Sequence, residues 1–354
     1  MDEEVIVRRS DVLPIAFVVP LQGPTGLYGP SCLACGELAV EQLNARNGIA
    51  GRRVELVQVD AGRPPEVVAE EVGRLVDSGR VEAVAGWHIS AVRVALTRRI
   101  GGRVVYAFAA MHEGGDDTPG VFMLGERPVN QLLPAAEWLR EHQGARRWVV
   151  VGNDYVYPRV TGSVAEEALD IVESAYVALG TSDFTDVING LKATKADGVI
   201  MLLMGQDAVH FNRQFARAGL SEDLLRLSTA IEENTLLGAG PGANHGVYAA
   251  AAYFDGLSTV ESNEFAQQYY TRYGAFAPAL NAVGESCYEA IHFLARLGEI
   301  AGSVEMSAAL PTGHFYDSPR GLLRLDGNLV DQDVYLAAAD GLEFRIEEQI
   351  ARSG

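Results

Sequence analysis

Short runs of β-branched and small apolar residues alternate with longer amphipathic stretches along most of this chain. The runs have the length of strands and the stretches have the apolar spacing of helices, so the pattern predicts parallel sheets with crossover helices. The first expected strands cover residues 15–20, 54–60, 82–87 and 104–109. Expected helices lie between them at about 30–47, 65–78 and 90–100. These segments predict one βαβ lobe.

The same alternation begins again in the middle of the chain and predicts a second lobe. Its first helix is bounded by Pro128 and Gly144, as helix punctuation predicts. The expected strands are 147–152, 173–179, 197–204 and 224–229. The other expected helices are 158–171, 184–194 and 207–218.

The last hundred residues predict a further strand at 247–254, two helices, and a closing part of a different kind. From Phe315 onward, Gly and Asp turns separate short alternating runs, which is typical of antiparallel hairpins. No low-complexity linker divides the halves, which favours several ordered crossings and hinge closure. We expect an α/β fold with two Rossmann-like lobes, a multi-strand hinge and a ligand cleft between the lobes. The N-terminal lobe is expected at 11–126 plus 253–312, and the C-terminal lobe at 127–252 plus 313–349.

Length and charge restrict the classes of partner. A chain of 354 residues suits two domains, each with its own core. A formal charge of -19 argues against nucleic acid, because phosphate binding needs clustered Lys and Arg. No segment reaches the roughly 18 uninterrupted apolar residues of a membrane helix, so no membrane insertion is expected. The oligomeric state is not indicated.

The N-terminal segment bears on the location of the protein in the cell. It opens with three acids, and its first long apolar stretch, Leu13 to Pro20, is only eight residues and lacks a basic start. These features favour a first strand over a signal peptide, and predict a cytoplasmic protein. The alternative is a periplasmic or extracellular protein whose export signal is absent from this sequence.

Motifs for catalysis, cofactors and metals are missing, so neither an enzyme nor a cofactor is expected. The chain has no G-x-S-x-G elbow, no P-loop and no H-E-x-x-H spacing. Cys32 and Cys35 form a C-x-x-C within a helix-like run, where small packing thiols are the simpler interpretation and a redox or metal role is the alternative. An enzyme on the same fold remains a third hypothesis, since fold alone does not decide function.

Polar and aromatic groups follow several strands, where ligands bind in open α/β sheets. In the first lobe, Tyr28 lies on a glycine-flanked loop, Ser90 begins a helix, and small Ala110 exposes backbone. A serine at a helix start either caps the helix or helps its N–H groups to hold a ligand oxygen.

The second lobe offers its own candidates at the ends of three strands. They are Asp154, Tyr155, Tyr157, Gln206 and Glu232, with Glu233 as the alternative to Glu232. An acid at the Glu232 position either complements a helix dipole or accepts hydrogen bonds from an ammonium, amide or urea N–H.

Several segments resemble the type I periplasmic-binding-protein family, in particular its branched-chain-amino-acid, urea and amide branch. The opening P-L-x-G-x-x-G-x-Y-G with ELAVEQLNARNGIAGRRVELVQVD is similar to the family's first strand, helix and second strand. NDYVYPR resembles a segment of urea-binding proteins and of the cytoplasmic amide sensor of the amidase operon. STAIEEN resembles their acid-rich loop, and YDSPRGLLRLDGN a segment near their C-terminus.

The resemblance implies roles for five positions. Ser90 matches a hydroxyl that holds the ligand's carboxylate or carbonyl, while Tyr155 and Glu232 match residues that close from the second lobe. His88 stands where the amide sensor has a tyrosine, which alters the cleft wall. Ala110 stands where amino-acid binders and the amide sensor usually have a threonine. The loss of that hydroxyl weakens the case for an α-carboxylate and shifts the expected ligand from an amino acid to an amide, urea or similar small polar molecule.

These observations predict a receptor that closes on a small polar ligand and signals its presence to a partner, such as a cytoplasmic regulator. The alternative is the substrate-binding component of an ABC transporter of the branched-chain amino acid or urea type, with a membrane permease as partner. Either output requires a closed form that the ligand stabilises.

Overall fold

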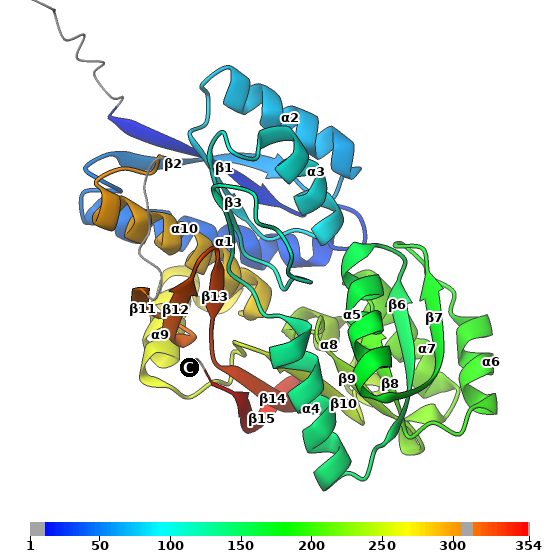
Figure 1. Cartoon of the computed structure of the whole chain (residues 1–354). Coiled ribbons are helices and arrows are strands. Elements are labelled where there is room, and N and C mark those ends of the chain that lie inside the picture. Colours follow the sequence, from blue (N-terminus) through cyan, green and yellow to red (C-terminus); the bar gives the residue numbers. More distant parts are fainter. Residues whose placement is uncertain (1–10, 306–313, 353–354) are drawn as a thin grey trace, which may run out of the picture.

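The computed structural model describes residues 11–305 and 314–352. They form two α/β lobes, each built on one mixed sheet with helices on both faces (Figure 1). Among these residues, none of the helices combines the length and apolarity that a membrane crossing requires.

The first lobe contains an eight-stranded sheet in the order β11-β12-β13-β5-β4-β3-β1-β2. The strands are β1 (Val12–Val19), β2 (Arg53–Asp60), β3 (Ala83–Gly86), β4 (Val105–Phe108), β5 (Val121–Met123), β11 (His314–Ser318), β12 (Gly321–Asp326) and β13 (Leu329–Asp331). Every residue of β3 and β4 is buried, as expected for parallel strands covered on both faces. Figure 1 shows α2 (Pro65–Asp77) and α3 (Ser90–Ile100) on one face and α1 (Gly29–Ala45) and α10 (Ala282–Ala301) on the other.

The second lobe contains a seven-stranded sheet in the order β15-β14-β10-β9-β8-β6-β7. The strands are β6 (Arg147–Asn153), β7 (Asp170–Val177), β8 (Gly198–Leu202), β9 (Leu225–Ser228), β10 (Val247–Ala251), β14 (Val334–Asp340) and β15 (Glu343–Ala351). Its helices are α4 (Pro128–His142), α5 (Val156–Ala168), α6 (Thr185–Ala193), α7 (Gln206–Arg217) and α8 (Glu233–Ala239). The remaining helix, α9 (Val260–Tyr273), packs in the first lobe against α1 and β11.

The predicted alternation of strands and helices agrees with this architecture, and the closing strands β11, β12 and β13 pair antiparallel. One boundary differs from the expectation. Residues from 313 onward were assigned to the second lobe, whereas β11 to β13 complete the first sheet and only β14 and β15 join the second. Residues 306–312, expected in the first lobe, lie outside the described residues.

Three chain crossings join the lobes, and their side chains tie them to one another. The Ala252 N–H donates to the Glu126 carboxylate at 2.6 Å, which links the crossing after β10 to the one after β5. The Gln332 amide donates to the Leu124 carbonyl at 3.1 Å and links the crossing after β13 to the same segment. The hinge is therefore an ordered three-strand connection and not a flexible tether.

Candidate ligand-binding site

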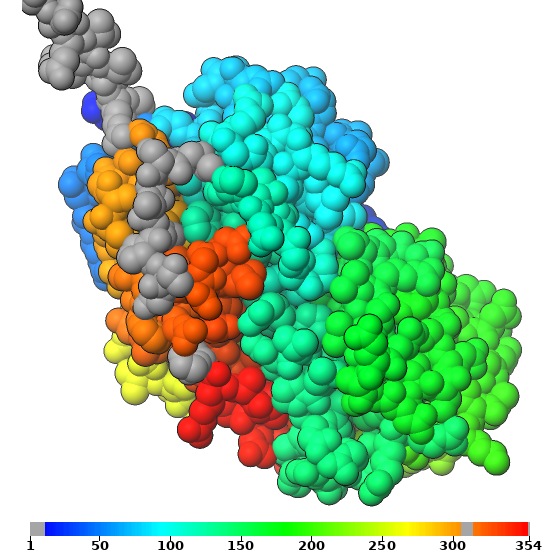
Figure 2. Space-filling model, viewed as in Figure 1, coloured from blue at the N-terminus to red at the C-terminus, as the bar shows by residue number. Residues whose placement is uncertain are grey.

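The two lobes touch along the carboxyl ends of their parallel strands, where the sheet order places loops from both sides (Figure 2). Tyr28, after β1, is fully buried and reaches across this boundary. Its hydroxyl accepts the Gly205 N–H at 2.7 Å and donates to the Ala230 carbonyl at 3.4 Å, and both partners belong to the second lobe. The edge of its ring meets Trp87 at 5.0 Å between centroids. The structure is therefore a closed form.

Gly205 shows how closely the lobes approach. Its φ of +52° is a backbone conformation that side chains disfavour, and a Cβ atom there would lie 2.3 Å from the Pro24 carbonyl oxygen of the first lobe. The next residue, Gln206, donates its backbone N–H to that same oxygen at 2.8 Å. Gln206 thus contributes its backbone to closure.

A very small cavity, with a free volume of about 10 Å³ in this closed form, lies at the lobe boundary. Its walls are apolar side chains, two hydroxyl groups and two carboxyl groups. They are Trp87, Met111, Glu126, Thr229, Ala230, Ile231, Glu232, Ala251, Ala282, Val283 and Ser286. No Lys or Arg is among these lining residues, so the acids give the cavity its electrostatic character.

Glu232 is the N-cap of α8 and is almost completely buried. One carboxylate oxygen accepts the Thr235 N–H at 2.9 Å and the Thr235 hydroxyl at 3.0 Å, and the other accepts the Asn234 N–H at 2.9 Å. Burial raises the pKa of Glu232 to about 7, although these hydrogen bonds lower it. A carboxylate offers about four acceptor sites, so the second oxygen has capacity left for a ligand.

Two second-lobe tyrosines lie near this region. The Tyr157 hydroxyl and Thr229 Oγ1 are hydrogen-bonded at 2.9 Å, which fixes a cavity-lining residue. The Tyr155 hydroxyl is buried and has no hydrogen-bond partner in the described chain. Burial raises the pKa of both tyrosines, and the Tyr28 hydroxyl contributes to the rise at Tyr155. A buried hydroxyl without a hydrogen-bond partner lowers the stability of the folded state. The Tyr155 hydroxyl would therefore gain from donating a hydrogen bond to a ligand.

Ser90 is the first residue of α3, and its hydroxyl donates to the Glu113 carboxylate at 2.8 Å. Arg93, one turn later, pairs with that carboxylate and with Asp116. All four groups are buried or nearly so. The Ser90 hydroxyl therefore binds a carboxylate oxygen, but this oxygen belongs to the Glu113 side chain and not to a ligand.

Two of the predicted ligand-binding residues, His88 and Asp154, do not line the cavity. Burial lowers the pKa of His88 to about 4, so the ring is neutral: Nδ1 donates to the Val18 carbonyl at 3.0 Å and Nε2 accepts from the Tyr106 hydroxyl at 2.5 Å. His88 therefore uses both nitrogens inside the first lobe. Asp154 is exposed and pairs with Arg159 at 2.8 Å. Neither side chain is available in the cavity.

Ala110 is buried at the start of the loop that connects β4 to β5. Its carbonyl oxygen would lie 2.2 Å from a Cβ atom at Gly125, so this loop packs tightly against the first hinge crossing. Met111 and Glu113 in the same loop, and Glu126 after β5, are site residues that the sequence pattern did not predict. These residues lie in loops, outside helices and strands. Their position after a buried strand is the only sequence feature that could have marked them as site residues.

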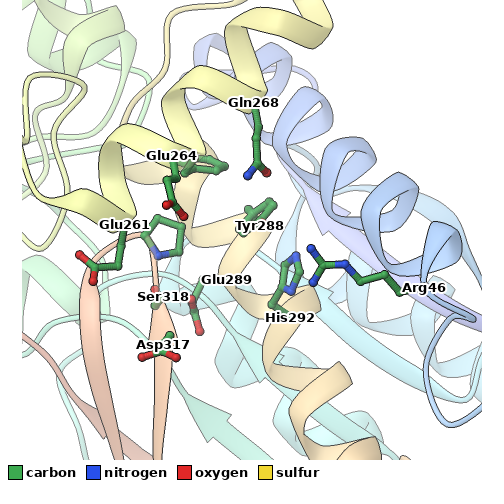
Figure 3. A pocket seen from close by; sticks show the side chains of 11 residues that line it. Arg46, Glu261, Glu264, Gln268, Tyr288, Glu289, His292, Asp317 and Ser318 are labelled. Carbon is green, nitrogen blue, oxygen red and sulfur yellow. The ribbon is translucent and has the colours of Figure 1, made fainter.

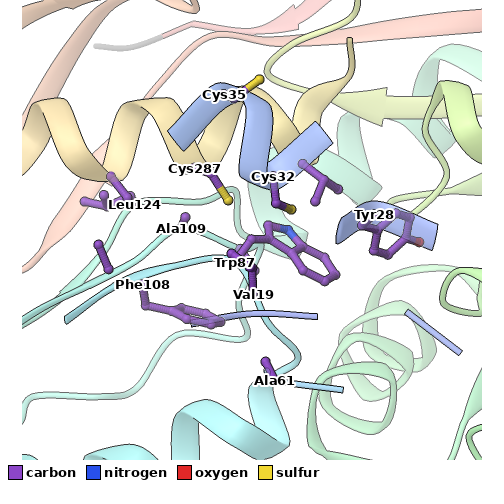
Figure 4. Packing of buried hydrophobic residues seen from close by; sticks show 14 of the residues in the cluster. Val19, Tyr28, Cys32, Cys35, Ala61, Trp87, Phe108, Ala109, Leu124 and Cys287 are labelled. Atoms are coloured by element: carbon purple, nitrogen blue, oxygen red, sulfur yellow. The ribbon is translucent and has the colours of Figure 1, made fainter. Parts of the chain in front are cut away.

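The three cysteines are buried in the first lobe, with Cys32 and Cys35 on α1 and Cys287 on the adjacent α10 (Figure 4). Burial raises the pKa of Cys32 and Cys35 well above the usual range, so both are neutral thiols. No group of three or more His, Cys, Asp or Glu in the described chain is placed to hold a metal ion.

A second hollow lies wholly in the first lobe, among α1, α9, α10 and β11 (Figure 3). It is roomier than the interlobe cavity, and its lining includes the cation Arg46, the acids Glu264 and Asp317, and His292. It lies at none of the strand ends that meet the other lobe. We therefore place the candidate site at the lobe boundary.

Solved structures of similar fold are solute-binding proteins. A benzoate-bound ABC-transporter solute-binding protein of Rhodopseudomonas palustris superposes with a TM-score of 0.84, at 18% identity, and the match covers 97% of each chain. The isoleucine-bound branched-chain amino acid transporter substrate-binding protein of Streptococcus pneumoniae gives 0.80 at 18% identity, over 95% of this chain and 98% of the other. At these identities the likeness shows the two-lobed fold.

Sequence comparison extends the likeness. The Leu/Ile/Val-binding protein homolog 3 of Brucella melitensis is 24% identical over 307 residues, which is 84% of this chain and 82% of the relative. The model of the family described as "Periplasmic binding protein" matches residues 12–343. This match overturns the predicted cytoplasmic location, because an acidic N-terminal segment is weak information about export. The family match spans nearly the whole sequence, so the chain belongs to the type I periplasmic-binding-protein family, in the branch of the Leu/Ile/Val-binding proteins.

Proposed function

We propose that the chain is the solute-binding component of an ABC transporter and that it closes on one small polar ligand with N–H donors, such as an amide or urea. The observation that carries this proposal is the cavity wall, where Glu126 and Glu232 present carboxyl groups and no basic residue lines the space. Carboxylates accept charge-assisted hydrogen bonds from N–H groups and repel other anions.

Tyr155 supplies a complementary group. An amide or urea carries a carbonyl oxygen beside its N–H groups, and the Tyr155 hydroxyl is a buried donor without a partner. In this proposal Glu232 accepts from the ligand's N–H and Tyr155 donates to its carbonyl. Such a ligand contacts the second lobe while Tyr28 and Trp87 cover it from the first, so it stabilises the closed form.

The partner in this proposal is a membrane permease that recognises the closed shape. The solved proteins of similar fold are described as transporter components that bind small molecules, which supports a permease and gives no support to a cytoplasmic regulator. These relatives are solute-binding proteins and not enzymes. The absence of catalysis in this chain stays a prediction.

A branched-chain amino acid is the second candidate ligand. The names of the Brucella relatives favour it, and Trp87, Met111 and Ile231 form an apolar wall that suits an aliphatic side chain. Glu232 would accept from its ammonium group. The cavity offers no cation to its carboxylate, which is why we rank an amide first.

A thermal-shift panel tests the proposal, because a ligand that binds only the folded state raises its apparent stability. The panel contains urea, acetamide, benzamide, leucine and isoleucine at millimolar concentration. We expect stabilisation by at least one amide or urea. Stabilisation by the amino acids alone would favour the second candidate, and no shift with any of them would refute a small-ligand receptor of this kind.

A further inference from the structure

The first lobe contains a complete carboxylate-binding site at the lobe boundary, and the chain fills it with its own side chain. One oxygen of Glu113 accepts from the Ser90 hydroxyl at 2.8 Å, and the other pairs with an Arg93 nitrogen at 2.5 Å. The Glu113 side chain is only 7% exposed and that of Arg93 only 6%. The pair is thus withdrawn from solvent.

Three observations place this site beside the ligand cavity. Glu113 follows Met111, which lines the cavity, by two residues. Ser90 and Arg93 belong to α3, and α3 contacts α5 of the second lobe. Ser90 also follows Trp87, another residue that lines the cavity, by three positions.

The donors that reach Glu113 are in use, while another donor of Arg93, its Nε–H, is buried and has no hydrogen-bond partner in the described chain. Ser90 has a single hydroxyl hydrogen, and Glu113 receives it. The terminal nitrogens of Arg93 are divided between Glu113 and Asp116. A ligand carboxylate would have to displace Glu113 or lie beside it as a like charge, and both are costly in a buried site.

We propose that Glu113 is a specificity-determining residue that occupies the carboxylate-binding site formed by Ser90 and Arg93 and thereby excludes ligands with a carboxylate. The inference rests on the proposed function of the interlobe cleft. It explains how a chain of this fold can select a neutral amide while keeping the serine and arginine that would bind an acid. Removing the Glu113 side chain vacates the site and leaves a hydroxyl and a partly paired guanidinium for an external carboxylate.

The test measures acid binding by the wild type, Glu113→Ala and Glu113→Gln with isothermal titration of acetate, benzoate and leucine. Asp117→Asn is the matched control, because Asp117 is an exposed acid of the same loop. We expect Glu113→Ala to bind at least one acid tenfold or more tighter than the wild type and the control. Adding Ser90→Ala to Glu113→Ala should remove most of that gain.

Two results would overturn the inference: a folded Glu113→Ala with no gain for any acid, or a wild type that binds acids as tightly as this variant. If Glu113→Ala fails to fold by circular dichroism, Glu113→Gln takes its place. Glutamine removes the negative charge that repels a ligand carboxylate. Glu113→Gln is then expected to bind at least one acid tenfold or more tighter than the control, and a smaller gain overturns the inference. The amide proposal is judged separately by the wild type with benzamide. A wild type that ignores amides beside a variant that gains acids refutes that proposal and supports this one.

Discussion

Each lobe brings one buried carboxylate to the lobe boundary, and the two are held in different ways. Glu113 in the first lobe is neutralised by Arg93 and hydrogen-bonded by Ser90. Glu232 in the second lobe is held by the N–H groups at the start of α8 and forms no ion pair in the described chain. Both oxygens of each carboxylate accept hydrogen bonds, but only Glu113 has a cation beside it. Glu232 has none in the described chain, and burial raises its pKa to about 7.

This difference indicates which carboxylate serves the ligand. A carboxylate that is already paired with a cation gains little from a ligand N–H, whereas a buried carboxylate without a cation gains a charge-assisted hydrogen bond on binding. We therefore assign ligand recognition to the second lobe and exclusion of acids to the first. Variants at the two positions should have opposite effects: loss of binding at Glu232 and a widened ligand range at Glu113.

The largest effect is expected from Glu232→Ala. Hydrogen bonds to charged groups contribute about 1.5–3 kcal/mol, so affinity for the ligand found in the panel should fall about 10- to 100-fold by isothermal titration. The N-cap is also lost, which costs about 1 kcal/mol of stability. Glu232→Asn keeps a capping side chain and separates the two effects. Glu222→Ala, an exposed acid of the same lobe, is the control, and an equal loss there would argue against Glu232 as the recognition group.

The pH dependence of stability should come next in size. The pKa of Glu232 is about 7 in the folded state and near 4.5 in the unfolded state, so between these pH values the folded state holds more protons. The free energy of unfolding therefore falls as pH rises from about 4.5 to 7, by up to about 1.4 kcal/mol per pH unit from this residue.

Glu285, whose burial also raises its pKa to about 7, adds to the same slope. The comparison is therefore between the wild type and Glu232→Gln, measured by urea unfolding at several pH values in this window. The variant should show the shallower fall. Identical slopes would mean that Glu232 is not the buried, unpaired acid described above.

A smaller effect is expected from Tyr28→Phe, which removes the hydroxyl that joins the lobes. A hydrogen bond of this kind contributes about 1 kcal/mol, so ligand affinity should fall about fivefold through a less stable closed form. Asp154→Asn is the control, since Asp154 is exposed and pairs only with Arg159. The interlobe role of Tyr28 is contradicted if the two variants bind equally well.

The fold was predictable because several of its central strands, such as β1 and β8, are continuous apolar runs with few structural interpretations. The assignment of β11 to β13 failed because hairpin residues carry no information about which of two sheets they extend. The three-residue β5 was missed because it is too short for any period to appear.

The candidate site was predictable only where a motif or a strand end marked it. Tyr28 and Glu232 lie in the segments that connect a strand to the next helix, and the structure brings both to the lobe boundary. His88 also follows a strand, but the pattern of apolar and polar residues does not show that its ring points into the core of the first lobe. Glu113 lies in an irregular loop, and its role depends on contacts with α3 that only the folded chain defines.

The central claim is that the cleft accepts N–H donors and rejects carboxylates, and a matched pair of ligands tests it most directly. Benzamide and benzoate have nearly the same shape and differ in the group that would meet the cavity's acids. Isothermal titration of the wild-type protein should show benzamide binding at least tenfold tighter than benzoate. Benzoate binding as tightly as benzamide, or tighter, would contradict the account.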